Sequence, residues 1–157
     1  MEFAIKPPLG LMTPNHFGAF VREMVRSFVL RSIMVRLFLI GLAGFVGTLG
    51  RYWLSGIVAR RFGETFPFGT LAVNLIGCFL VGLLFYVMQE RFLVDQNVRT
   101  IILIGLLGGF TTFSSLGLQT FTLLQDGEFG LAAANLGVSN LIGLFMVWAG
   151  YSLARVL

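Results

Sequence analysis

Four long apolar runs, separated by short polar connections, constrain the fold of this chain more than any other feature. They cover roughly residues 37–58, 68–88, 98–124 and 131–154. Each is long enough to cross the hydrocarbon core of a bilayer, which needs about 20 helical residues. Charged residues make up only 11% of the chain, against roughly 25% in a typical soluble domain. The sequence therefore predicts an all-α integral membrane protein with four transmembrane helices, and it excludes a soluble enzyme.

The first 33 residues differ from the rest, because they mix prolines and charges and contain no run long enough to span a membrane. Two interpretations stay open. In the first, residues 1–33 are an N-terminal extension in which residues 21–36 form an amphipathic helix at the membrane interface. In the second, Met34 is the natural start and the upstream stretch is mis-assigned. In both, residues 34–157 are the four-span domain.

The basic residues indicate membrane orientation rather than nucleic-acid binding, because the arginines stand singly between apolar runs and form no phosphate-binding patch. An even number of spans places both termini on one side of the membrane. From Met34 onward, the terminal side carries Arg36, Arg91, Arg99 and Arg155, and the opposite side carries Arg60 and Arg61. This bias is weak enough for insertion in either direction. If the extension counts, its basic residues favour termini in the cytoplasm.

Neutral polar side chains, rather than carboxylates, are concentrated within the spans. None of the four spans contains Asp, Glu, Lys or His, and Arg51 lies near the end of the first. A proton-driven transporter usually needs a titratable group in the membrane, so this composition favours a passive pathway lined by hydrogen-bond donors. The candidates are Thr70, Asn74, Thr111, Thr112, Ser114, Ser115, Asn135 and Ser139.

Adjacent glycines followed by Thr-Thr in the middle of the third span predict a break in that helix at residues 108–112. Glycine costs a helix interior about 1 kcal/mol relative to alanine. A helix that breaks inside the membrane exposes backbone carbonyls, which can bind cations. On the first span, Gly41, Gly44, Gly47 and Gly50 recur every three residues and predict close helix packing.

Two segments carry a resemblance to a known family. The stretch from Pro67 to Gly77 reads PFGTLAVNLIG, and the stretch from Gly108 to Ser115 reads GGFTTFSS. Together, in a four-span chain, they resemble the fluoride channel family Fluc, also called CrcB, over residues 34–157. The resemblance implies passive fluoride export across the bacterial cytoplasmic membrane by an antiparallel, dual-topology dimer.

The resemblance also implies a role for individual residues. Asn74 corresponds to a pore asparagine, Phe113 to a pore phenylalanine whose ring edge faces fluoride, and Arg51 to an arginine near the pore entrance. The backbone carbonyls of Gly108 and Thr111, from both subunits, correspond to the ligands of a structural sodium ion. The polar residues expected to line the pathway are Thr70, Thr112, Ser114, Ser115, Asn135 and Ser139.

The chain departs from the family pattern after Ser115. Leu116 stands where a second phenylalanine is common, and Gln119 stands where a glutamate is common. A leucine has no electropositive ring edge, so a two-ring arrangement cannot form from this chain alone. The chain is then either a homodimeric channel with altered conduction, or a complementary or non-conducting subunit of a heterodimer. A small four-span drug transporter is a further alternative, which the missing intramembrane carboxylate disfavours.

Overall fold

The computed structural model describes residues 14–63 and 65–157, and all the regular structure in that part of the chain is helical. Four helical stretches are long and apolar enough to cross a membrane: His16–Phe62, Phe68–Arg91, Gln96–Gln125 and Phe129–Val156. The predicted all-α fold with four spans is confirmed at this level.

The first helix, α1, runs from Pro14 to Phe62 and is 49 residues long. It therefore begins well before residue 37, where the apolar pattern placed the start of the first span. Proline suits the first turn of a helix, because its missing N–H has no helical partner at that position. The chain divides into two compact units, Met1–Leu37 and Phe38–Leu157. Residues 38–62 of α1 belong to the second unit, together with all the later helices.

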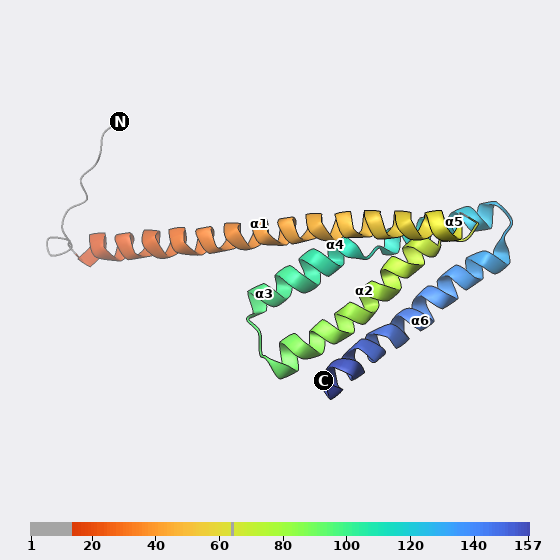
Figure 1. The fold of residues 1–157 in the computed structure, drawn as a ribbon. Helices are drawn as coiled ribbons and strands as arrows, with labels where there is room; N and C mark the ends of the chain where they lie inside the picture. The colour runs from red at the N-terminus through yellow and green to blue at the C-terminus, as the bar shows by residue number, and fades with distance from the viewer. Residues whose placement is uncertain (1–13, 64) are drawn as a thin grey trace. The chain divides into compact units, whose positions relative to one another are not determined.

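Helices α2 (Phe68–Tyr86) and α6 (Phe129–Val156) form the most extensive helix contact of the second unit (Figure 1). A Cβ atom on Gly82 would meet the carbonyl oxygen of Val147, and one on Gly150 would meet the carbonyl oxygen of Phe79. The two helices thus touch backbone to backbone at these glycines. A short π-helical segment, η2 (Val87–Arg91), continues α2.

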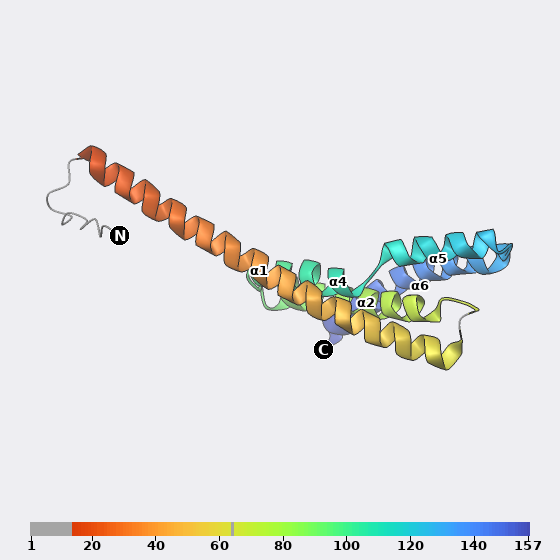
Figure 2. The same ribbon diagram turned by 90° about the horizontal axis from the view of Figure 1, so that it is seen from above.

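The third span consists of four pieces rather than one helix: α3 (Gln96–Thr100), the π-helical η3 (Ile101–Leu107), α4 (Gly108–Phe110) and α5 (Phe113–Gln125). Asp95 starts it by accepting a hydrogen bond from the Asn97 backbone N–H at 2.7 Å, which satisfies one of the free donors of a helix N-terminus. Between α4 and α5 the chain leaves the helix altogether (Figure 2).

The predicted packing role of the first-span glycines is confirmed at Gly47, whereas a Cβ atom at Gly44 or Gly50 would make only ordinary van der Waals contact. A Cβ on Gly47 would collide with the Leu106 carbonyl oxygen, so only glycine allows α1 this close to η3. Cβ atoms on Gly44 and Gly50 would lie 3.6 Å and 3.5 Å from their nearest neighbours in η3 and α4. Gly41 has nothing within 4 Å of its Cβ position, so this chain gives it no packing role.

Candidate ion pathway

The third span is interrupted at Thr111 and Thr112, which join α4 to α5 in extended conformation. Thr111 has φ −87° and ψ 159°, and Thr112 has φ −152° and ψ 113°. The predicted break within residues 108–112 is therefore confirmed. Its position is narrower than expected, because Gly108 and Gly109 remain helical in α4. The threonine pair, rather than the glycine pair, carries the extended backbone.

The Asn74 side chain on α2 forms two hydrogen bonds with the backbone of this extended segment. We call this pair of hydrogen bonds the Asn74 clamp. Its Oδ1 accepts a hydrogen bond from the Thr112 backbone N–H at 2.9 Å, and its Nδ2 donates to the Thr112 carbonyl at 3.1 Å. The amide oxygen thereby satisfies the Thr112 N–H, which the break leaves without a helical partner. The Thr112 carbonyl also belongs to the first turn of α5, because Thr112 is the N-cap of that helix. The clamp uses one of the two N–H bonds of Asn74 and leaves the other for a ligand.

The break leaves the last four carbonyls before it, those of residues 108–111, without helical partners, and two of them are Gly108 and Thr111. In a continuous α-helix, the Thr112 N–H would bond to the Gly108 carbonyl and the Ser115 N–H to the Thr111 carbonyl. Here Thr112 N–H bonds to Asn74, and Ser115 N–H bonds to Thr112 Oγ1 at 3.2 Å. Carbonyl oxygens are hard ligands that suit alkali and alkaline-earth cations. The Gly108 carbonyl is left for the sodium-ligand role that the resemblance implies, whereas the Thr111 carbonyl also accepts a hydrogen bond from the cationic Arg51 guanidinium. Two carbonyls alone are too few to surround a cation.

Arg51 reaches the same segment from α1. Its guanidinium donates a long hydrogen bond of 3.4 Å to the Thr111 carbonyl. One turn earlier on α1, the Thr48 hydroxyl donates to the Gly109 carbonyl at 3.4 Å. Among the residues described, Arg51 has no carboxylate within ion-pair distance, so its charge stays available to an anion.

Three hydroxyl groups meet at the start of α5. Thr112 Oγ1 donates to Ser115 Oγ at 3.0 Å and lies 3.2 Å from Ser114 Oγ. Because Thr112 has a single hydroxyl hydrogen and gives it to Ser115, Ser114 is the donor in the second contact. Ser115 then keeps its own hydroxyl hydrogen for another acceptor. Three of the four hydroxyls expected to cluster therefore meet, and Ser115 is the member with a free donor. The fourth, on Thr111, instead donates to the Leu107 carbonyl at 3.1 Å.

A cavity of about 370 Å³, with several polar side chains in its lining, lies beside this cluster. It brings together Arg51, Thr70, Thr112, Ser115 and Gln119, all of which the sequence singled out, and it is completed by Thr48, Tyr52, Ser55 and Val73. Gln119 Oε1 is buried and has no hydrogen-bond partner. Burying a polar atom without a partner costs folding free energy, and here the atom belongs to a side chain that lines the cavity.

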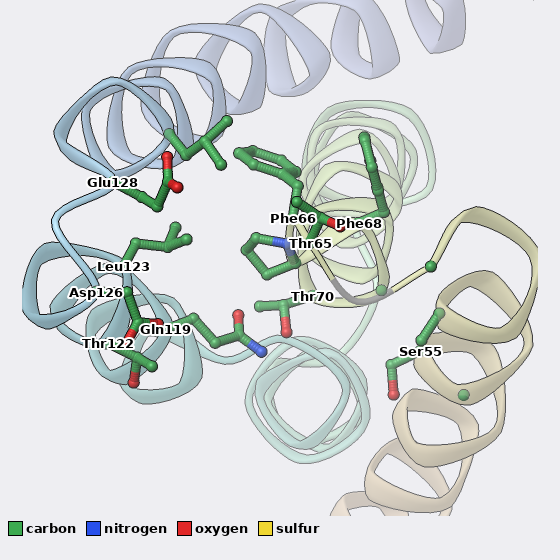
Figure 3. A pocket seen from close by; sticks show the side chains of 16 residues that line it. Ser55, Thr65, Phe66, Phe68, Thr70, Gln119, Thr122, Leu123, Asp126 and Glu128 are labelled. Carbon is green, nitrogen blue, oxygen red and sulfur yellow. The ribbon is translucent and has the colours of Figure 1, made fainter.

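A larger open pocket of about 640 Å³ adjoins this cavity, since Ser55, Thr70 and Gln119 line both. Figure 3 shows the Gln119 side chain extending from α5 toward Thr70 across this pocket. Asp126 and Glu128, at the turn between α5 and α6, also line it. The sequence marked Gln119 only as a departure from a pattern and missed its central place in this pocket. Its position four residues after Ser115, on the same helix face, was the available signal.

A third cavity of about 280 Å³ lies on the other side of Thr112, which lines it together with Asn74, Phe113, Leu116 and Ser139. Ser139 Oγ is buried without a partner, so a neutral donor is available there too. The Phe113 side chain is 75% exposed, whereas Leu116 is only 4% exposed and packs within its own chain. Asn140 also lines this cavity, and the sequence interpretation did not include it.

Asn135 is placed apart from these residues. It is 1% exposed, and its Nδ2 donates to Thr120 Oγ1 at 2.9 Å between α5 and α6. Thr120 in turn donates to the Leu116 carbonyl at 2.8 Å. Asn135 lines none of the three cavities above. The structure therefore gives it a role in joining two helices and does not bring it to the other predicted pathway residues.

Comparison with known proteins identifies the family. Residues 38–151 match the family described as CrcB-like protein, Camphor Resistance (CrcB). A protein of Opitutus terrae is 46% identical over 114 residues, covering 71% of this chain and 86% of its own. A protein of Solidesulfovibrio magneticus is 42% identical over 125 residues, covering 80% of this chain and its own full length. One of Citrifermentans bemidjiense is 46% identical over 124 residues, covering 79% of this chain and its own full length.

All three relatives bear the name fluoride-specific ion channel FluC. The match covers the second and third spans completely, including the break in the third span, together with residues 38–62 of the first span and residues 129–151 of the fourth. The chain is a multi-pass membrane protein, and it belongs to the CrcB-like family.

Proposed function

We propose that this chain is a subunit of a fluoride-selective channel that exports fluoride passively across the bacterial cytoplasmic membrane. The observation that carries the proposal is the clamped break at Thr111–Thr112, lined by neutral donors and by Arg51. Fluoride is small and strongly hydrated, so a pathway must replace its water with close hydrogen-bond donors. The relatives named as fluoride-specific channels support the same conclusion.

The proposed pathway follows the two cavities that Thr112 lines, whose walls are largely apolar but carry a few hydrogen-bond donors. Arg51 attracts the anion into the first cavity, where Gln119 Nε2 and the free Ser115 hydroxyl replace water. The anion then passes the remaining Asn74 N–H and the electropositive edge of the Phe113 ring on the way to the cavity that Ser139 lines. Each of these donors beyond Arg51 is neutral, so none holds fluoride as tightly as a fixed charge would.

The driving force in this proposal is the membrane potential. Hydrogen fluoride enters a cell as a neutral molecule, dissociates in the less acidic cytoplasm and leaves fluoride trapped there. A potential that is negative inside then drives the anion outward through a passive path. Export thereby reduces fluoride toxicity without a coupled proton, which fits the lack of Asp, Glu, Lys and His within the predicted spans.

The channel we propose is an antiparallel dimer. Phe113 is 75% exposed in the single chain, which supports a second subunit covering it. Gly108 and Thr111 of each subunit would hold a sodium ion at the shared interface, where the ion would fix the two broken helices relative to each other. A homodimer is the simplest assembly. Leu116 supports the alternative of a heterodimer, whose partner supplies the second phenylalanine.

Efflux from liposomes that contain this chain as the sole protein tests the proposal. Vesicles loaded with fluoride or with chloride are diluted into ion-free buffer, and a potassium ionophore removes the opposing potential. We expect release of fluoride and retention of chloride. Equal release of both anions, or no release of either, would contradict a fluoride-selective homodimer. If the chain alone is silent, a large gain of fluoride flux in Leu116→Phe would identify it as the complementary subunit.

A further inference from the structure

The N-terminal part of α1 carries an amphipathic segment that the ion pathway does not use. Phe17, Val21, Met24 and Phe28 recur at helical spacing and so share one face. Arg22 and Arg26 lie on the opposite face, since each residue turns the helix by about 100°. We call residues 17–28 the N-terminal arm. The helix begins at Pro14, which adds Phe17 and Phe20 to the stretch whose amphipathic character the sequence suggested.

The apolar face of the N-terminal arm is open to its surroundings. Phe17 is 46% exposed, Met24 53% and Phe28 71%. The arm contains one hydroxyl side chain, Ser27, which donates to the Met24 carbonyl at 2.9 Å and so needs no water of its own. A face of large apolar side chains exposed to this degree marks a surface that binds something.

Crossing the membrane does not require the N-terminal arm. Residues 38–62 of α1 already exceed the about 20 helical residues that one crossing needs. Residues 17–28 also have the composition of an interfacial helix rather than a span, because two arginines and Glu23 fall within three turns.

The charge of the N-terminal arm favours an anionic lipid surface over a second copy of the arm as the partner of the apolar face. The N-terminal arm contains two arginines, Arg22 and Arg26, against the single carboxylate of Glu23. Two copies of the arm side by side would bring these like charges together. An anionic lipid surface accepts the apolar face at the acyl boundary and neutralises the arginines at the headgroups. We propose that the N-terminal arm binds the anionic phospholipid surface of the bilayer in which the channel sits, with α1 bending between the arm and residue 38.

A fluorescent label on each face of the arm tests this proposal in the full-length protein. Cys78 is first replaced by Ser, and a polarity-sensitive fluorophore is attached at Met24→Cys on the apolar face. The matched control places the same label at Ala19→Cys, which is exposed on the side of the arginines. Both proteins are reconstituted in vesicles of phosphatidylcholine alone, or of phosphatidylcholine with phosphatidylglycerol.

We expect the Met24 label to shift to shorter wavelength and to become protected from the water-soluble quencher acrylamide when phosphatidylglycerol is present. The Ala19 label should stay accessible in the same vesicles. Replacing Arg22 and Arg26 by Gln should weaken the binding equilibrium of the arm by about 30-fold, roughly fivefold for each arginine. High salt should reduce the protection in the same direction.

Two results would overturn the proposal. In the first, the Met24 label is quenched equally in both kinds of vesicle. In the second, protection of the Met24 label from acrylamide does not depend on phosphatidylglycerol and rises with the protein-to-lipid ratio. That result would identify a second copy of the chain as the partner. The readout does not involve fluoride, so its failure is separate from a failure of the proposed channel function.

Discussion

Two parts of the transmembrane unit satisfy the hydrogen bonds of their buried backbone groups in opposite ways. Helices α2 and α6 keep their own hydrogen bonds and approach each other through Gly82 and Gly150. The third span gives up its helical bonds at Thr111–Thr112 and relies on the Asn74 side chain for replacement. The uninterrupted pair is a scaffold, whereas the interrupted span presents free backbone and hydroxyl groups. Asn74 lies on α2, so the interrupted span depends on the scaffold for its hydrogen bonds.

The largest expected effect comes from breaking the scaffold. A side chain at Gly82 would collide with the backbone of Val147, and backbone cannot move aside as a flexible side chain does. We expect Gly82→Val to destabilise the protein by at least about 3 kcal/mol, at the upper end of overpacking costs. Thermal unfolding in detergent measures it. Gly137→Val on α6, where a Cβ meets nothing within 4 Å, is the control and should leave the unfolding temperature nearly unchanged.

Removing the clamp should have the next largest effect. Asn74→Ala leaves the Thr112 N–H without its partner, and an unsatisfied buried group costs about 1–3 kcal/mol. We therefore expect a loss of about 1–3 kcal/mol. Asn140→Ala is the matched control, because the Asn140 amide is exposed and donates only to the Leu136 carbonyl of its own helix. Equal unfolding temperatures for the two variants would show that Asn74 does not hold the break.

Replacing the hydroxyl at the break tests the polar cluster at nearly constant volume. Thr112→Val removes the N-cap of α5 and the bonds to Ser114 and Ser115. We expect about 1 kcal/mol lower stability and a clear fall in fluoride efflux. Thr112→Ser keeps the hydroxyl and should restore both. Thr100→Val, whose hydroxyl bonds only to the Gln96 carbonyl, should behave as wild type. Full fluoride efflux in Thr112→Val would remove this hydroxyl from the pathway.

The smallest effect on stability is expected at Gln119. Its Oε1 is buried without a partner, so Gln119→Leu removes an unsatisfied atom and should leave stability unchanged or raise it by up to about 1 kcal/mol. Fluoride efflux should nevertheless fall, because the amide lines both cavities on the Arg51 side. A large loss of stability, or unchanged efflux, would assign Gln119 a packing role instead.

The sequence predicted the features of the fold that depend on local composition. The four apolar runs gave the spans, and the Gly-Gly-Phe-Thr-Thr stretch gave the break. It did not predict the π-helical η3, because that hydrogen-bond register depends on how η3 packs against Gly47 of α1. Nor did it place the start of α1 at Pro14, since polar residues within 14–36 hide a continuous helix from a search for apolar runs.

The sequence identified several residues that line the cavities, but it did not identify the hydrogen bonds between helices. Arg51, Thr70, Thr112 and Ser115 line one cavity, and their roles in an ion pathway stay predictions. The clamp by Asn74 and the pairing of Asn135 with Thr120 are contacts between separate helices, which spacing along one helix cannot reveal. Asn135 and Asn74 are both asparagines within an apolar span, so the sequence alone does not separate their roles. Their hydrogen-bond partners do, because Asn74 bonds to the backbone of the break and Asn135 bonds to Thr120 on the neighbouring helix.

Fluoride and chloride efflux from liposomes containing either wild-type protein or Asn74→Ala tests the central claim most directly. The claim is that the break held by Asn74 is the path of the ion. Wild-type protein should release fluoride and retain chloride, and Asn74→Ala should lose fluoride release by at least about tenfold, the factor that 1.4 kcal/mol represents, even below its unfolding temperature. Fluoride release by folded Asn74→Ala at the wild-type rate would contradict the claim.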